Sequence, residues 1–415
     1  MLDLSLIDLK DIYCTNEEAG RQPSRYANAI AAFREAFGRE PESIFSAPGR
    51  TEVGGNHTDH QHGEVLAASI NRDAIAVVAP RAERIVNVLA EGFGKTVIDI
   101  DDLEIKPSET GTTSSLIRGV LAGLQGEGFR LGGFDAYITS DVLIGAGLSS
   151  SAAFETLIGT IVSGLFNDMK IDPVTIAKIG QFAENKYFGK PCGLMDQTAC
   201  SVGNLVHIDF KDPDAPIVEK VSFDFSTTDY VLCITDTKGS HADLTHEYAA
   251  VPEEMKKIAS LLGHEVLREI TLDDIMDNIC MLRESAGDRA VLRAIHFVNE
   301  TKRAHDEAMA LQKGNLPKFL DLVRKSGDSS FKYLQNVYTN SDVTVQNVSL
   351  ALAISDSILG DDEVSRVHGG GFAGTIQAFV KKENAANYRE HMDKVFGSGA
   401  CEVLAIRKYG GIRVL

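Results

Sequence analysis

The residues most suited to chemistry are concentrated in four short segments. The segment at residues 47–63 reads APGRTEVGGNHTDHQHG and brings one arginine, two acids, an asparagine and three histidines into a glycine-rich loop. Between them, such side chains donate to and accept from hydroxyl groups, so polyol recognition is a natural use of this loop. Two other interpretations stay open, a metal site formed by His57, His60 and His62 or a plain solvated loop.

A glycine-serine segment at residues 144–153, IGAGLSSSAA, follows a strand-like stretch and opens a predicted helix. Glycines let backbone N–H groups approach an anion, the helix N-terminus adds a positive dipole, and serine hydroxyls bind phosphate oxygens or a metal ion. The segment lacks the third glycine of a dinucleotide-binding fingerprint and the lysine of a Walker A loop. It indicates a phosphate site, with a serine-capped helix as the structural alternative.

The other two segments are less specific when taken singly. GKPCGLMDQ, at residues 189–197, places a lone aspartate, Asp196, just after a turn, where it could also be a helix N-cap. HGGGFAG, at residues 368–374, precedes a predicted strand. Its triple glycine either lets the backbone pass close to a ligand or makes a flexible turn.

Composition limits the partners that these segments can serve. The chain has 415 residues, with 41 Lys+Arg against 59 Asp+Glu, a net charge of −18, and no tryptophan. This acidic excess argues against a nucleic-acid groove or an anionic membrane surface, so an anionic ligand must be held locally. The six cysteines are scattered without a C-x-x-C pair, and neither a signal peptide nor a membrane-spanning stretch is evident. We therefore expect a cytoplasmic protein.

Hydrophobic periodicity predicts the elements that must position the four segments. The first half interleaves strands with helices, and the second half has long helices before its strands, which indicates an α+β fold. The expected strands are 42–46, 74–79, 85–90, 96–100, 134–139, 374–380 and 401–406, and the expected helices are 24–37, 116–124, 150–166, 174–188, 252–262, 289–312, 316–325 and 343–357. A turn-rich KDPDAP segment at 211–216 predicts an N-terminal lobe over 1–213 and a C-terminal lobe over 214–415.

Taken in this order, the four segments resemble those of the GHMP kinases, and within that superfamily the galactokinase branch. Galactokinases read GRVNLIGEHTDY, PxGxGLSSSAA, PCGIMDQ and GGGFGG where this chain reads GRTEVGGNHTDH, LIGAGLSSSAA, PCGLMDQ and GGGFAG. The resemblance implies a two-lobed fold with a mixed sheet and helices in each lobe, the active site between the lobes, and a last strand that can return to the first lobe. It also implies ATP-dependent phosphorylation of the anomeric C1 hydroxyl of galactose or a close relative.

The resemblance assigns a role to each matching residue. Asp196 would accept the proton of the C1 hydroxyl, and Arg50 would keep Asp196 ionised and stabilise charge on the transferring phosphoryl group. Mg²⁺ would be held by Glu184 with Ser150 or Ser151. The expected sugar contacts are Arg50, Asn56, His57, Asp59, Cys192, Gly193, Asp196, Tyr248 and Gly370. The expected ATP contacts are Gly145, Ala146, Gly147, Leu148, Ser149, Ser150, Ser151 and Ala152.

The chain departs from the galactokinase pattern at positions that the resemblance places near the sugar and beside the adenine base. Asn56 stands where galactokinases carry a glutamate for the C6 hydroxyl, and Glu52 replaces an asparagine. An amide donates as well as accepts, so it would tolerate a C6 carboxylate or a missing C6 group. Galacturonate or L-arabinose 1-kinase activity, and a non-catalytic galactokinase-like sugar sensor, therefore remain alternatives. Thr113 and Leu116 occupy the places of aromatic residues beside adenine. Sugar and ATP are the expected partners, and the oligomeric state stays open, with a monomer among the alternatives.

Overall fold

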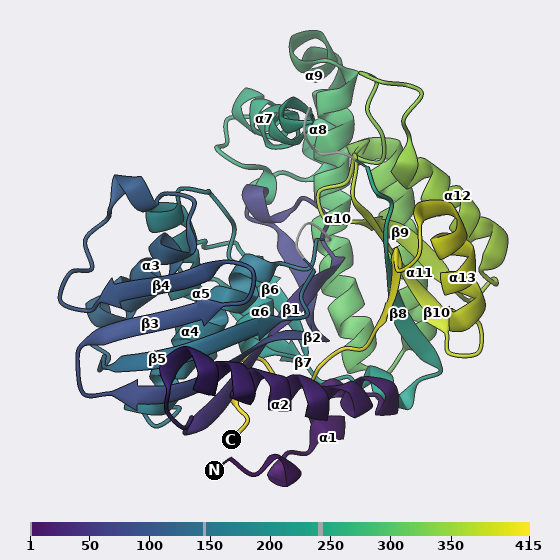
Figure 1. Cartoon of the computed structure of the whole chain (residues 1–415). Helices are drawn as coiled ribbons and strands as arrows, with labels where there is room; N and C mark the ends of the chain where they lie inside the picture. Colours follow the sequence, from purple (N-terminus) through teal and green to yellow (C-terminus); the bar gives the residue numbers. More distant parts are fainter. Residues whose placement is uncertain (1, 144–146, 240–243) are drawn as a thin grey trace.

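The computed structural model describes residues 2–143, 147–239 and 244–415, and it has two lobes that are each built on one β-sheet (Figure 1). The large sheet is mixed, with the strand order β12-β1-β2-β5-β3-β4 and with β6 and β7 continuing from β2. Its strands are β1 (Ser43–Gly54), β2 (Glu64–Arg81), β3 (Ile85–Ala90), β4 (Gly94–Asp99), β5 (Gly133–Ser140), β6 (Leu205–Asp209), β7 (Ile217–Val221) and β12 (Ile412–Arg413). The small sheet is antiparallel, in the order β11-β8-β10-β9. Its strands are β8 (Tyr230–Asp236), β9 (Val364–His368), β10 (Thr375–Lys381) and β11 (Cys401–Leu404).

Helices accompany both sheets, which confirms the predicted α+β class (Figure 1). The large-sheet lobe contains α1 (Leu9–Tyr13), α2 (Asn16–Phe37), α3 (Thr113–Gly126), α4 (Ser150–Phe166), α5 (Pro173–Phe182) and α6 (Met195–Val202). The small-sheet lobe contains α10 (Asp288–Gln312), α11 (Leu316–Ser329), α12 (Asn347–Ile358) and α13 (Ala385–Phe396). Helix α7 (Thr245–Leu261) and the two short helices α8 (Leu272–Asp277) and α9 (Ile279–Ala286) gather at one end of α10. Among the described helices, none has the length and apolar character needed to cross a membrane.

The central strands of the large sheet, β1 and β2, are buried on both faces. Alternate side chains of β2 point in opposite directions, so Ala76 and Val78 join the core with α3, α4 and α5. Ile75 and Val77 instead pack with the side chains of α1 and α2. Burial on both faces explains the continuous apolar run of β2 at residues 74–79, which is typical of covered strands.

The first segment differs from the predicted loop. Residues 47–54 continue β1 and are all buried, so only residues 55–63 form the loop between β1 and β2. The prediction of a loop over 47–63 was therefore wrong in its first half, because polar residues in a doubly covered strand hide its apolar pattern. Register shifts between Pro48 and Arg50 and between Glu52 and Gly54 interrupt the pairing with β2. Such bulges bend a strand and redirect its side chains.

The two lobes share part of their core. Leu66 and Ile70 of β2 belong to the same buried cluster as Phe319 of α11 and Phe379 of β10. The C-terminal strand β12 pairs with β1 in the large sheet, and β7, which lies after the predicted boundary, pairs with β6. The division at 213/214 stays a prediction. This shared core packs β2 of the large sheet against α10, α11 and the small sheet.

Candidate active site

An ion pair between Arg50 of β1 and Asp196 of α6 forms the centre of the site. Arg50 Nε donates to Asp196 Oδ1 and Arg50 Nη2 to Asp196 Oδ2, both at 2.7 Å, and such bidentate pairing fixes the carboxylate in one orientation. The Asp196 side chain is 30% exposed whereas that of Arg50 is 11% exposed. Burial opposes ionisation, but the Arg50 charge, together with the hydrogen bonds from Arg50 and Ser149, outweighs it, and the pKa of Asp196 lies below its ordinary value. Asp196 is thus ionised and accessible, as a carboxylate that accepts a proton must be.

Ser149 connects this ion pair to the glycine-serine segment. Its backbone is left-handed, with a φ of 56°, and its hydroxyl donates to Asp196 instead of capping α4. The first N–H groups of α4 are therefore free of a side-chain cap, which suits an anion at the positive end of the helix. Both capping alternatives are wrong, because Asp196 also lies inside α6 rather than at its N-cap. Gly145 and Ala146 lie outside the described residues.

Glu184 lies beside the same helix N-terminus. It is buried on a short π-helix, η4 (Ala183–Phe188), that continues α5, and π turns are frequent at functional sites. Ser151 Oγ donates to Glu184 Oε1 at 3.2 Å, Lys190 Nζ donates to the same oxygen at 3.1 Å, and Gln197 Nε2 donates to Oε2 at 2.9 Å. A carboxylate and a serine hydroxyl are the hard oxygen ligands that Mg²⁺ prefers, so these residues fit the ion.

A cavity of about 800 Å³ adjoins Ser150 and Ser151, a volume typical of small-molecule sites. Thr113 and Leu116 line it, as expected for residues beside adenine. The cavity nevertheless has aromatic residues, from positions that the sequence analysis missed: Phe93, Phe154 and Phe188. Phe93 lies between β3 and β4 and Phe188 ends the π-helix, so only the folded chain brings them together.

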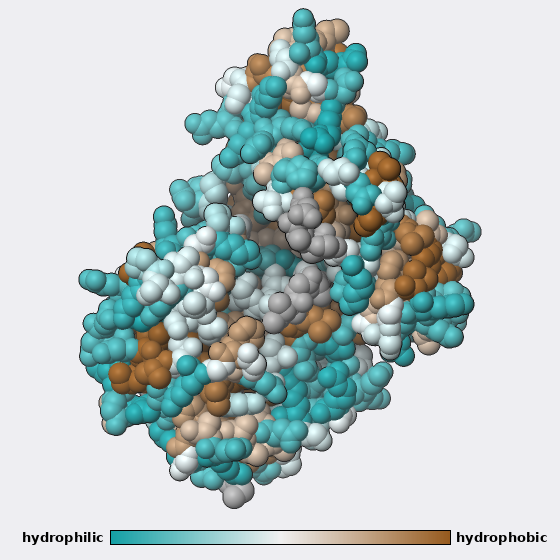
Figure 2. All heavy atoms as spheres, turned by 45° about the horizontal axis from the view of Figure 1, so that its top comes forward, coloured by the Kyte–Doolittle hydropathy of each residue, from teal (hydrophilic) through white to brown (hydrophobic). Residues whose placement is uncertain are grey.

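On the other side of the site, two predicted sugar contacts meet the triple glycine. His57 Nε2 lies 3.0 Å from the Gly370 carbonyl oxygen, and the Tyr248 hydroxyl donates to the Gly371 carbonyl at 2.8 Å. Gly371 has a φ of 78°, and a Cβ there would lie 2.0 Å from the Asn336 carbonyl oxygen, so glycine is required. The surface is hollowed between the two lobes (Figure 2).

Asp59 and Gly193 bring the first and third segments into contact. A Cβ at Gly193 would come within 2.7 Å of Asp59 Oδ2, so the close approach depends on glycine. The neighbouring Cys192 is held by its backbone N–H, which donates to Asn185 Oδ1 at 2.7 Å. These predicted sugar contacts therefore lie together in the fold, although they are more than a hundred residues apart.

Asn56 is completely buried, and its amide is hydrogen-bonded within the protein. Asn56 Nδ2 donates to Glu52 Oε1 at 3.0 Å and to the Gly369 carbonyl at 2.6 Å, while Oδ1 accepts from Asn336 Nδ2 at 2.8 Å. Glu52 also accepts from Arg366 Nη2. Positions 52 and 56, which both depart from the galactokinase pattern, are thus in direct contact. Here Asn56 holds the glycine segment in place, and its contact with sugar stays a prediction.

The histidines of the 55–63 loop give no support to the metal alternative. The rings of His57 and His60 meet edge to face, with centroids 5.7 Å apart. Within the described residues, the cluster of side chains arranged as metal ligands includes none of the loop histidines. That cluster consists of Glu64, His207 and His305.

Comparisons with known protein families match the regions that contain the first three of the four segments. Residues 31–80 match the galactokinase galactose-binding signature, and residues 115–204 match the GHMP kinases N terminal domain. The chain is 28% identical over 352 residues to a galactokinase of Streptomyces coelicolor. This alignment covers 84% of this chain and 87% of that protein. It is also 28% identical over 372 residues to a galactokinase of Lactobacillus helveticus. That alignment covers 88% of this chain and 93% of the relative.

Solved structures share the fold. The crystal structure of Lactococcus lactis galactokinase complexed with galactose matches with a TM-score of 0.77 and 25% identity, covering 93% of this chain and 99% of that chain. A crystal structure of mevalonate kinase matches with a TM-score of 0.62 at 16% identity. The predicted resemblance is confirmed: the chain matches the galactokinase galactose-binding signature and the GHMP kinases N terminal domain, and it is similar to galactokinases over most of its length.

Proposed function

We propose that this chain transfers the γ-phosphoryl group of ATP to the anomeric C1 hydroxyl of galactose or a close relative. The observation that carries the proposal is the bidentate pair of Arg50 with Asp196, next to the N-terminus of α4. An ionised carboxylate accepts the hydroxyl proton, and a fixed guanidinium stabilises negative charge that develops on the phosphoryl group. The galactokinase relatives support the same reaction.

The remaining predicted residues divide between the two substrates. We assign the ATP phosphates to the segment from Gly147 to Ala152 at the start of α4, and the base to the cavity lined by Thr113 and Leu116. Glu184 with Ser150 or Ser151 would hold Mg²⁺, which neutralises phosphate charge when it is bound. Because no cysteine among the described residues is in a disulfide, a reducing, cytoplasmic location is in keeping with this assignment.

The sugar specificity is where this chain can differ from its relatives. With the carboxylate at position 52 rather than 56, the negative charge pairs with the buried Arg366 side chain. This exchange favours a second candidate, a kinase for galacturonate or L-arabinose. A glutamate at position 56 would repel the C6 carboxylate of galacturonate, and asparagine removes that repulsion. The sugar-sensor alternative is less favoured, since Asp196, Arg50 and the serines of α4 are all in place.

A panel assay tests the proposed reaction. ADP release should be measured with galactose, galacturonate, L-arabinose and N-acetylgalactosamine as acceptors, at saturating ATP and Mg²⁺. We expect turnover with at least one of these sugars. Tight sugar binding without ADP release for any sugar would instead establish the sensor. A strong preference for galactose alone would rule out the proposed change in specificity.

Exchanging positions 52 and 56 is expected to show that they act as a pair. Asn56→Glu places a second buried carboxylate against Glu52 and should cost about 3 kcal/mol of unfolding free energy. The double variant, Glu52→Asn with Asn56→Glu, keeps one negative charge in the network. It should recover about 1–3 kcal/mol of that loss and raise kcat/KM for galactose relative to L-arabinose. Denaturant unfolding and steady-state kinetics of the two single variants and the double variant measure both effects. Additive losses of stability, with no change in sugar preference, would contradict the pairing.

A further inference from the structure

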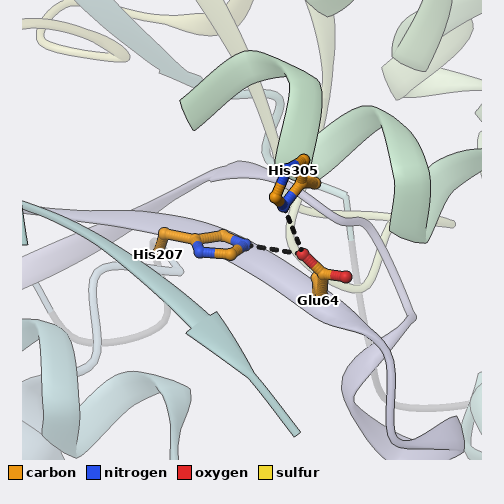
Figure 3. Close-up of side chains that lie close together, drawn as sticks. All are labelled: Glu64, His207 and His305. Carbon is orange, nitrogen blue, oxygen red and sulfur yellow. Dashed lines mark hydrogen bonds and ion pairs between the residues drawn. The ribbon is translucent and has the colours of Figure 1, made fainter. Parts of the chain in front are cut away.

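Three side chains outside the kinase site converge on the underside of the 55–63 loop: Glu64 of β2, His207 of β6 and His305 of α10 (Figure 3). Glu64 Oε2 lies 2.8 Å from His207 Nε2 and 3.1 Å from His305 Nδ1. One ligand atom from each residue lies within 4.8 Å of the other two. We propose that these residues bind one divalent transition-metal ion, for which Zn²⁺ is the best fit, and that the ion ties α10 to the large sheet.

The sheet register places two of the three ligands on rigid neighbouring strands. Leu66 pairs with His207 between β2 and β6, so Glu64 and His207 are diagonal neighbours on one face. His207 in turn pairs directly with Glu219 of β7. Helix α10 packs on β2, β6 and β7 and supplies His305. A site built on strands and a helix holds its geometry better than one on loops.

The donor set selects the kind of metal. Two imidazole nitrogens and one carboxylate oxygen form the protein part of a tetrahedral Zn²⁺ site whose fourth position is open to water. The His305 side chain is 48% exposed, whereas His207 is 6% exposed, so solvent reaches the cluster from the α10 side. Mg²⁺ and Ca²⁺ prefer oxygen ligands alone, which distinguishes this cluster from the oxygen-rich surroundings of Glu184.

The surroundings of the three ligands also favour a cation. His207 Nδ1 is buried without a hydrogen-bond partner, and Glu219 Oε2 lies 3.6 Å from it, where a carboxylate can orient a metal-bound histidine. Arg268 is the cation nearby, but it approaches the other oxygen of Glu64, Oε1, at 3.5 Å and pairs with Asp209 at 2.9 Å. Glu64 Oε2 therefore remains directed at the two imidazoles.

A bound ion would stabilise the loop that leads to the kinase site. The Glu64 backbone N–H donates to Thr301 Oγ1 of α10 at 2.7 Å, and Thr58 Oγ1 donates to the Glu64 carbonyl at 2.7 Å. His296 Nε2, also on α10, lies 2.9 Å from the Asn56 carbonyl oxygen. Fixing Glu64 to His305 would thus hold the end of the 55–63 loop against α10 and raise the melting temperature.

Zn²⁺ titration of the full, chelator-treated chain tests the site by calorimetry, with metal analysis after dialysis. We expect one Zn²⁺ per chain, and at least about tenfold weaker binding in His305→Ala and in Glu64→Gln. His305 is half exposed, so its alanine variant should fold. The control His391→Ala, an exposed histidine on α13, should bind as the unaltered chain does. His62→Asn tests the 55–63 loop and should also bind normally.

Two readouts decide the proposal. Zn²⁺ should raise the melting temperature of the unaltered chain but not that of His305→Ala. Absence of stoichiometric Zn²⁺ binding would overturn the site, as would undiminished binding in both His305→Ala and Glu64→Gln. Loss of binding in His62→Asn would place the ion in the loop instead and would equally overturn it. None of these readouts requires kinase activity.

Discussion

Replacing Asp196 with asparagine should lower kcat on the order of 10³-fold and leave sugar affinity nearly unchanged. The amide has the shape of the carboxylate and can still accept from Arg50, so the site keeps its form. It cannot take the proton of the C1 hydroxyl, and that transfer belongs to the transition state. Both kcat and kcat/KM should therefore fall by the same factor.

Steady-state kinetics combined with calorimetric sugar titration separates this effect from misfolding. Asp361→Asn, an exposed aspartate in the small-sheet lobe, is the matched control and should leave kcat unchanged. Turnover of Asp196→Asn equal to that of the unaltered chain would contradict its role as proton acceptor. A fall in sugar affinity as large as the fall in kcat would show a binding role instead.

Replacing Arg50 with methionine should lower kcat/KM by about 10²-fold or more and also change its pH dependence. The charge of Arg50 keeps the pKa of Asp196 low against the opposing effect of burial. Without Arg50, only the weaker effects of the Ser149 hydrogen bond and the Lys190 charge oppose burial, so the pKa of Asp196 rises and its carboxylate becomes protonated at a higher pH. The acid limb of the profile of kcat/KM against pH should therefore move toward neutral pH.

Arg50→Lys is the informative partner of this variant. It restores the positive charge but not the two parallel hydrogen bonds, so its acid limb should lie between those of the unaltered chain and Arg50→Met. A merely structural role of Arg50 would lower activity equally at every pH. An unshifted acid limb in Arg50→Met would thus contradict the electrostatic role.

Local hydrophobic patterns predicted the helices and strands that have a clear apolar period and turn residues at both ends. The helix at 150–166 and the strand at 85–90 have the predicted bounds, because each has a clear apolar period and sharp turn residues at its ends. The second half of β1 was not predicted, since Arg50 and Glu52 interrupt the apolar pattern of a strand whose buried polar groups pair across the fold. The sequence predicts one ordinary helix over 174–188, whereas the structure has a π-helix at its end that carries Glu184. The wider π turn has no distinct hydrophobic pattern in so short a segment, so the sequence does not reveal it.

Motif order predicted the residues of the kinase site but not their partners. Arg50 and Asp196 come together as the resemblance implied, whereas Ser149, expected only as an ATP contact, also donates to Asp196. The contact of Asn56 with Glu52 depends on the turn of the 55–63 loop, so two departures that looked separate are one exchange. The Glu64 cluster joins residues up to 241 positions apart through the register of β2 with β6 and the packing of α10, which no local pattern contains.

The position of phosphate on the product is the most direct measurement. The unaltered chain should be incubated with ATP, Mg²⁺ and the sugar that it turns over fastest, and the product examined by phosphorus and proton NMR. A phosphomonoester whose phosphorus couples to the anomeric proton is expected, and it should be absent with Asp196→Asn. Phosphate on any other hydroxyl, or ATP consumption without a sugar phosphate, would contradict transfer to C1 by Asp196 and Arg50.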